Sequence, residues 1–345
     1  MRARELLRVV GVFVLVVGLV LGGTGLAAFA TEPAQTYTPV ENEQFQPSAL
    51  LPAEEDETGT VELDADAGEE KTVVVDMAHG NAIDESDLEP MTSALVRNGH
   101  EVRVHSQGDL NASLRRADAY VVATPRQPFS PGEVAGIRAF VDAGGRLLLL
   151  SEPPKTTVQG GLFSVSFSTV GDTHTGVASG YGLGFGDGYL YDTADDGHFK
   201  SVAAEPTGSE GLAAGVDRLV LREAVPVTAS DDATVVASDA GETTLSTTRR
   251  AGDHALVARN GGVVAVGDTD FLRSENAAVA DNEVFIGNLA AFLVSGEKTA
   301  GAPKPPGEDE PRPPGGPAPR PGPAPPSGGG GDEPTPPATP SPTPA

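Results

Sequence analysis

Acidic and imidazole side chains follow several predicted strands, and these groups are the ones best suited to chemistry. In chain order they are Asp76 and His79 after TVVV, Glu152 after RLLLLS, and Asp268 and Asp270 after GGVVAVG. In open α/β sheets, ligands bind beyond the carboxyl ends of the strands. Carboxylate oxygens suit Ca²⁺ or Mg²⁺, and a histidine beside them could support metal-assisted hydrolysis. All five residues are therefore candidate metal ligands, while turns and helix caps explain the same residue types without a metal.

The composition excludes several other kinds of chemistry. The 345 residues contain no cysteine, which removes disulfides, thiol nucleophiles, thiolate zinc and iron–sulfur clusters. With 23 basic and 49 acidic residues, the formal charge is −26. Nucleic-acid binding depends on Lys and Arg neutralising phosphates, so no nucleic-acid partner is expected. No cofactor is expected either.

The N-terminus predicts export. Three arginines precede the uncharged run Val9–Ala30, which would span about 33 Å as a helix at roughly 1.5 Å per residue. The positive flank places the chain start in the cytoplasm and the rest outside. Residues 1–30 are thus a signal anchor, giving a single-pass membrane protein with an extracellular C-terminal domain. The alternative is a signal peptide cleaved after Ala28-Phe29-Ala30, which would give a secreted protein.

Composition divides the remainder into three parts. Residues 31–70 are acidic and contain no Lys or Arg, which predicts a disordered stalk. Residues 71–296 have an ordinary globular composition. Residues 297–345 are rich in Pro and Gly, which predicts a disordered tail of polyproline-II spacers.

The globular part begins with alternating strand and helix signals. Strands are expected at Thr72–Asp76, Glu101–His105, Ala119–Ala123 and Arg146–Leu150, with helices between them, over Asp84–Asn98, after Asn111 and from Pro131. Ser130-Pro131-Gly132-Glu133 fits a capping box. Later strands are expected near Arg218–Leu221, Thr234–Ala237, Ala255–Ala258 and Gly262–Gly267, before a closing helix over Asp281–Val294. Apolar strands separated by helices predict a flavodoxin-like α/β domain with a mostly parallel sheet, helices on both faces and an irregular Gly-rich insertion.

A set of ordered motifs resembles a known family. These motifs are DMAHG at Asp76–Gly80, PFSPGEVAGIRAFVDAGGRLLLLSEP at Pro128–Pro153, GLGFGDGYLYD before residue 193, and GGVVAVGDTDFL followed by DNEVFIGNLAAFLV. Together they resemble a domain-of-unknown-function family of exported or membrane proteins from haloarchaea and bacteria. That family is similar to the class I glutamine amidotransferase-like fold and to auxiliary proteins of gliding-motility-type transport systems. The resemblance implies the fold and a partner in a transport or envelope complex.

The resemblance also locates the place of a nucleophile. In the amidotransferase-like fold a cysteine stands on a tight elbow after the strand that Arg146–Leu150 matches, and here that place reads Ser151-Glu152-Pro153-Pro154. The elbow glycine is missing, and the prolines lack N–H donors for an oxyanion hole. Ser151 and Glu152 are therefore weak catalytic candidates, and a structural turn is the favoured interpretation.

Three other features have simple structural interpretations. His174 and His198 lie in Gly- and Asp-rich loops, which predicts exposed polar side chains. The aromatic group Tyr181, Phe185, Tyr189 and Tyr191 predicts a packed edge, with a sugar-stacking platform as the alternative. Asn111 is part of a sequon that could carry a glycan, although capping a helix explains it.

These observations favour a non-catalytic, membrane-anchored extracellular binding or scaffolding module. The alternatives are a metal-assisted hydrolase using the five candidate ligands, and a carbohydrate-binding domain using the tyrosines. Acidic residues are dispersed and only five residues are lysine, a composition that predicts a halophilic protein kept hydrated in high salt.

Overall fold

The computed structural model describes residues 12–13, 15–16, 60–63, 69–160, 165–193, 198–241 and 243–304. The chain divides into two units, one made of Met1–Glu57 with Asp195–Gly197, the other of Thr58–Ala194 with His198–Ala345. In the first unit the structure describes Val12, Phe13, Leu15 and Val16, which are helical and exposed. The rest of the predicted anchor lies outside the described residues. Within the described part of the chain, no helix combines the length and apolarity needed to cross a bilayer.

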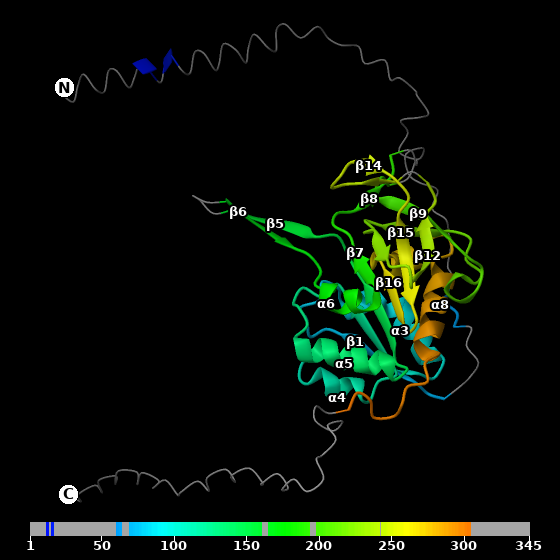
Figure 1. Cartoon of the computed structure of the whole chain (residues 1–345). Coiled ribbons are helices and arrows are strands. Elements are labelled where there is room, and N and C mark those ends of the chain that lie inside the picture. Colours follow the sequence, from blue (N-terminus) through cyan, green and yellow to red (C-terminus); the bar gives the residue numbers. More distant parts are fainter. Residues whose placement is uncertain are drawn as a thin grey trace, which may run out of the picture. The chain divides into compact units, whose positions relative to one another are not determined.

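The second unit is built on a nine-stranded mixed sheet (Figure 1). Its strands run in the order β10-β9-β12-β15-β16-β4-β3-β1-β2. Five neighbours are parallel: β2 (Glu101–His105), β1 (Thr72–Asp76), β3 (Ala119–Ala123), β4 (Arg146–Leu150) and β16 (Val263–Val266). From β16 outward the pairing is antiparallel: β15 (Ala255–Asn260), β12 (Thr234–Asp239), β9 (Ser201–Pro206) and β10 (Leu219–Arg222). The four predicted early strands are confirmed, and the sheet is parallel in one half and antiparallel in the other.

Helices cover both faces of the sheet, as predicted. Side chains alternate across a strand, so Val73 and Val75 of β1 pack into one core while Val74 packs into the other. The first core contains η2 (Glu85–Leu88), α3 (Glu89–Arg97) and α8 (Asn282–Val294); the second contains α4 (Leu110–Leu114) and α5 (Pro131–Asp142) (Figure 1). The remaining helices are short: α6 (Thr175–Ala178), η3 (Ser179–Tyr181), η4 (Gly211–Ala213), η5 (Asp270–Leu272) and α7 (Ser274–Ala277).

The Gly-rich insertion contains small sheets of its own. A hairpin of β5 (Lys155–Gly160) and β6 (Val165–Val170) leaves the main sheet after β4 and returns to α6. Next, β7 (Leu183–Phe185) pairs with β11 (Val227–Ala229). A three-stranded sheet joins β8 (Leu190–Tyr191), β13 (Thr244–Leu245) and β14 (Arg250–Ala251). Because the hairpin returns to the main sheet, residues that follow β6 lie close to the end of β4.

The predicted helix cap at Ser130 is confirmed, and the predicted cap at Asn111 is wrong. The Ser130 hydroxyl accepts the Glu133 N–H and the Glu133 carboxylate accepts the Ser130 N–H, which is the predicted capping box. Asn111, however, is not a cap. Asp109 caps α4 by accepting the Asn111 N–H, and the Asn111 side chain instead contacts α5 at Gly136, where an added Cβ would lie 1.6 Å from Asn111 Oδ1.

The folded unit extends beyond the expected boundaries of 71 and 296. Val61 and Leu63, inside the predicted stalk, are buried in the first core, and Arg97 donates to the Val61 carbonyl at 2.8 Å. After α8, the Lys298 ammonium donates to the carbonyls of Leu114, Arg115 and Ala302. The rest of the predicted stalk up to residue 59, and the tail from residue 305, lie outside the described residues.

Candidate functional site

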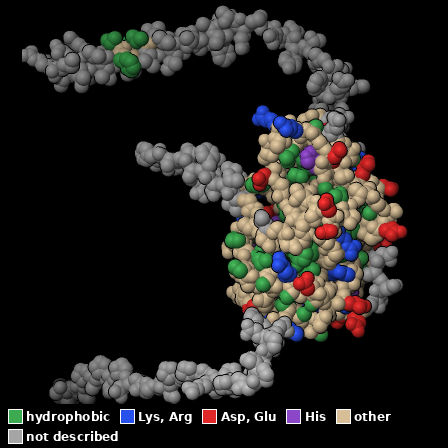
Figure 2. All heavy atoms as spheres, in the orientation of Figure 1, with side chains coloured by type: hydrophobic (Ala, Val, Ile, Leu, Met, Phe, Trp, Pro, Cys, Tyr) green, Lys and Arg blue, Asp and Glu red, His purple; other side chains and the backbone are tan. Residues whose placement is uncertain are grey.

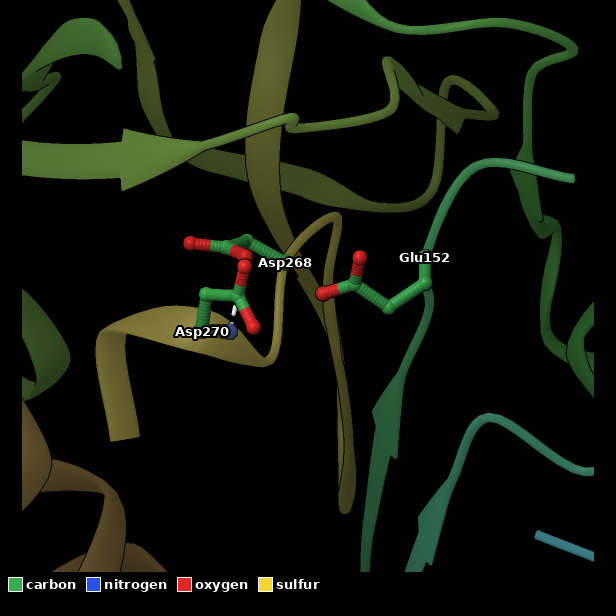
Figure 3. Close-up of side chains that lie close together, drawn as sticks. All are labelled: Glu152, Asp268 and Asp270. Atoms are coloured by element: carbon green, nitrogen blue, oxygen red, sulfur yellow. Dashed lines mark hydrogen bonds between the residues drawn. The ribbon is translucent and has the colours of Figure 1, made fainter. Parts of the chain in front are cut away.

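Three carboxylates meet beyond the carboxyl ends of β4 and β16. Because these strands are parallel neighbours, Glu152 after β4 and Asp268 after β16 come to the same edge, and Asp270 begins η5 beside them (Figure 3). One potential ligand oxygen from each of these three lies within 4.8 Å of the others. Oxygen donors at this spacing are suited to Ca²⁺ or Mg²⁺.

Hydrogen bonds fix two of these carboxylates and leave one oxygen free. Glu152 Oε1 accepts from the Thr269 N–H at 2.9 Å and from its hydroxyl at 2.6 Å. Asp268 accepts the N–H groups of Arg222 and Asp270. Glu152 Oε2 is buried and has no hydrogen-bonding partner. The cluster is thus rigidly held, yet one acceptor in it remains unsatisfied.

Burial and mutual repulsion disfavour the charged forms of this cluster. Burial first, and then the charge of Asp270, raise the pKa of Glu152 above its usual value. Burial and then the charge of Glu152 raise the pKa of Asp268 well above its usual value. Groups arranged in this way are stabilised by a proton or by a bound cation.

Asp76 and His79 form a separate pair after β1. His79 Nδ1 lies 3.0 Å from both carboxylate oxygens of Asp76, and its Nε2 lies 3.7 Å from Glu133 Oε1. The imidazole stacks on Phe129, with ring centroids 3.8 Å apart. Burial lowers the pKa of His79, but hydrogen bonding and charge from Asp76, helped by Glu133, outweigh it and raise the pKa overall.

The serine at the predicted nucleophile position is bound to a carboxylate. The Ser151 hydroxyl donates to Asp172 Oδ2 at 2.8 Å, and the Glu152 N–H donates to the same oxygen at 2.8 Å. Burial raises the pKa of Asp172 to about 6. Within the described residues, no histidine hydrogen-bonds to Ser151. The hydrogen-bonding partner of the Ser151 hydroxyl is thus a carboxylate.

A buried histidine lies beside this turn, which contradicts the prediction that His174 is exposed. The ring is 2% exposed, and Nε2 donates to the Leu150 carbonyl at 2.8 Å. Burial lowers the pKa of His174 to about 4, so the ring is neutral near pH 7. Its Nδ1 is buried without a partner. His198 is exposed, as predicted.

A cavity of about 210 Å³ adjoins these groups at the end of β4. Its lining includes Ser151, Glu152, Asp172, His174 and Phe185. Asp172 and His174 follow β6 in the chain, so the β5–β6 hairpin separates them in sequence from β4. Sequence reasoning missed Asp172 altogether. The one available signal was the polar run GDTH, which is equally typical of a solvent-exposed turn.

The five candidate metal ligands therefore fall into two groups. Glu152, Asp268 and Asp270 come together, while Asp76 and His79 pair with each other and with Glu133.

The aromatic group packs into the domain. Tyr181 and Phe185 contact the second core, and Lys200 lies over the Tyr189 ring at 4.8 Å from its centroid. Tyr189 and Tyr191 have ring centroids 6.2 Å apart. This arrangement matches the predicted packed edge.

Fold and site together define a mixed α/β domain with an acidic site at the carboxyl edge of its parallel strands. Residues 91–290 match the family model described as "Domain of unknown function (DUF4350)", and the chain belongs to that family. The predicted membership of a domain-of-unknown-function family is confirmed. The comparison with curated proteins found no match.

Solved structures show similarity of fold at low sequence identity. The structure titled "mmIFT52 N-terminal domain" is 13% identical, with a TM-score of 0.52, covering 66% of this chain and 99% of that one. "Cytoplasmic Protein STM1381 from Salmonella typhimurium LT2" is 14% identical, with a TM-score of 0.41, covering 65% of this chain and 99% of that one. The first similarity supports the α/β fold alone.

Proposed function

We propose that the protein is a non-catalytic binding module held on the outer face of the cell membrane by its N-terminal segment. One observation carries the non-catalytic part. Ser151, at the place of a nucleophile, donates a hydrogen bond to the Asp172 carboxylate, no histidine of the described residues hydrogen-bonds to it, and a cavity adjoins it. The uncharged run Val9–Ala30 supports the anchor. A protein of a transport or envelope complex is the proposed macromolecular partner.

The strand order supports a finer assignment of the fold. The parallel strands run β2-β1-β3-β4-β16, which is the 2-1-3-4-5 order of flavodoxin-like proteins. We therefore propose a flavodoxin-like core, related to the class I glutamine amidotransferase-like fold, with an antiparallel extension beyond β16. The turn at Ser151 then occupies the nucleophile elbow and serves binding instead.

Membrane fractionation of cells making the full-length chain with a C-terminal tag tests the anchor. The tagged chain should stay with membranes after an alkaline carbonate wash, and protease added to intact cells should remove the tag. A variant lacking residues 1–30 is the control and should lose both properties. A full-length chain that is soluble and protected from the protease would overturn the proposal.

A serine-directed fluorophosphonate probe tests the absence of a nucleophile. The wild-type protein and Ser151→Ala should both remain unlabelled, because no histidine among the described residues hydrogen-bonds to the hydroxyl. Labelling of the wild-type protein that disappears in Ser151→Ala would show an activated serine and contradict the non-catalytic assignment.

The carboxylate cluster supports a second candidate function, divalent-cation binding. Glu152, Asp268 and Asp270 bring three oxygens together, and Glu152 Oε2 has no other partner. Because His79 is not part of this group, the arrangement supports a structural or ligand-bridging cation better than metal-assisted hydrolysis. Calorimetric titration with Ca²⁺, Mg²⁺ and Zn²⁺ should give heat that Asp268→Asn abolishes and the exposed control Asp231→Asn retains. No heat with any ion would reject the site.

We also propose that the acidic surface is an adaptation to high salt. Asp and Glu side chains are spread over the visible face of the domain, with Lys and Arg among them (Figure 2). Dispersed like charges repel one another at low ionic strength, and a short Debye length mutes that repulsion.

A further inference from the structure

The main sheet ends in an open edge at β2. Among the strands that the structure describes, β2 pairs with β1 on one side and with none on the other. The Glu101 N–H donates to the Lys71 carbonyl at 2.8 Å, which turns the backbone groups of Glu101 toward β1. Alternate residues of a parallel strand bond to the same neighbour, so the backbone groups of Val102 and Val104 face the open edge. Such an edge is a template for pairing with another chain.

Apolar side chains border this edge on one face of the sheet. A groove of about 560 Å³ beside β2 and α3 is lined in part by Val75, Leu88, Val96, Val102 and Val104. Val96 is 58% exposed and Val104 is 41% exposed. Of the large hydrophobic side chains that the structure describes in the second unit, only these two and Phe199 are so exposed. Exposed apolar surface thus adjoins the open backbone, as it does where a partner chain binds.

Hydrogen-bond geometry limits how a second copy of β2 can pair with this edge. In an antiparallel pair, two residues that face each other direct their backbone groups both toward the other strand or both away from it. Two identical strands related by a two-fold axis therefore align with one residue facing its own copy. The possible registers of β2 differ in which residue lies at this centre.

The charges of β2 distinguish these registers. Centring on Glu101 or on Arg103 places like charges against each other, which destabilises a strand pair. Centring on Val104 places Arg103 against His105. Centring on Val102 places Glu101 of each copy against Arg103 of the other. Only this register sets opposite charges face to face, because Glu101 and Arg103 stand symmetrically on either side of Val102.

We propose that β2 joins two copies of this chain in an antiparallel pair centred on Val102, forming one continuous sheet across a dimer. Val102 exchanges backbone hydrogen bonds with its own copy, and Val104 exchanges them with His100 of the second copy. Glu101 and Arg103 are 39% and 47% exposed and lie 2.7 Å apart, so both charges are available at the edge. The two-fold axis is perpendicular to the sheet, so the two grooves adjoin on one face and their apolar walls cover each other.

Single-cysteine cross-linking of the purified full-length chain in molar NaCl tests the proposal, since the native chain contains no cysteine. In this register the two Val102 Cα atoms are about 5.5 Å apart, which is within the range of a disulfide. The two Val104 Cα atoms are four residues apart along the pair, or roughly 14 Å, which is beyond that range. Oxidation with copper phenanthroline should therefore give a covalent dimer of Val102→Cys and none of the more exposed Val104→Cys.

Two further measurements separate pairing from a folding defect. A mixture of Glu101→Cys and Arg103→Cys chains should cross-link at least about fivefold more than either variant alone, because these exposed positions face each other. Adding Val104→Lys to Val102→Cys should abolish the dimer, since it places a charge at the groove. Adding Phe199→Lys makes the same kind of change at an exposed apolar residue elsewhere and should leave the dimer intact. Circular dichroism melting checks that each variant folds.

Three results would overturn the proposal. Equal cross-linking of Val102→Cys and Val104→Cys would indicate random collision, and cross-linking of Val104→Cys alone would indicate another register. Absence of a dimer both in Val102→Cys and in the mixture would show that β2 does not pair with its own copy.

Discussion

Replacing Asp172 with asparagine should change how the stability of the domain depends on pH. The carboxylate is nearly buried, with its side chain 11% exposed, and it accepts hydrogen bonds from Ser151 and the Glu152 N–H. Asparagine has the same shape, and its Oδ1 can accept both bonds. The substitution therefore removes the titratable charge while retaining the local contacts.

The magnitude follows from the pKa. Burial raises the pKa of Asp172 from 3.8 to about 6, and one pKa unit corresponds to about 1.36 kcal/mol. Because the folded state holds the proton more tightly, this contribution to stability is complete below pH 3.8 and is lost as the pH rises through about 6. The loss amounts to about 3 kcal/mol. Asparagine does not titrate. The free energy of unfolding of the variant, minus that of the wild type, should therefore rise by about 3 kcal/mol between pH 3.5 and 7.

Urea denaturation followed by circular dichroism, at fixed molar NaCl and several pH values, measures this difference. The other acidic groups titrate in both proteins and cancel in the comparison. Asp231→Asn makes the same substitution at an exposed position and is the control. A difference between Asp172→Asn and wild type that stays constant from pH 3.5 to 7 would refute the assignment of a buried, destabilised carboxylate.

Four further outcomes are expected. Gly136→Ala should cost about 1–3 kcal/mol in chemical denaturation, because its Cβ would lie 1.6 Å from Asn111 Oδ1. Gly287→Ala places a Cβ 2.1 Å from the Glu62 carbonyl oxygen, so it should lower the melting temperature and expose residues 60–63 to protease. An unchanged melting temperature would contradict the role of residues 60–63 in the fold. Asp268→Asn should abolish any stabilisation by Ca²⁺ or Mg²⁺ in thermal melts, because it removes one carboxylate from the cluster of three. Lowering KCl well below molar should lower the melting temperature of the wild type, and equal melting in low and high salt would reject the halophilic interpretation.

The parallel half of the fold was predictable because its signals are local. β1, β3 and β4 are short apolar runs bounded by turns, and β2 alternates valine with polar residues. The capping box at Ser130 begins α5 where the sequence indicated. The candidate cluster of Glu152, Asp268 and Asp270 was also predictable in part. Carboxyl ends of parallel strands meet at one edge, and this rule needs the strands alone.

Other features depended on contacts between distant parts of the chain. Of the antiparallel half, β10, β12 and β15 were expected near their observed positions and β9 was not expected. The pairing of these strands was not predicted, since periodicity gives no strand partner. Val61 and Leu63 lie in an acidic segment that predicts disorder. They are nevertheless buried, because they pack in the first core on the surface of α3 and α8. Composition describes a segment by itself and says nothing of such a surface.

The sequence by itself therefore determined the absence of cysteine chemistry, the elements of the parallel half and the residues available at its carboxyl edge. The tertiary structure alone decided which of those residues share a site. It separated Asp76 and His79 from Glu152, and it brought Asp172 and His174 to the end of β4 from beyond the β5–β6 hairpin. His174 looked exposed because Gly- and Asp-rich segments are typical of loops. It is buried because the Leu150 carbonyl accepts its N–H inside the domain, a contact between residues 24 positions apart.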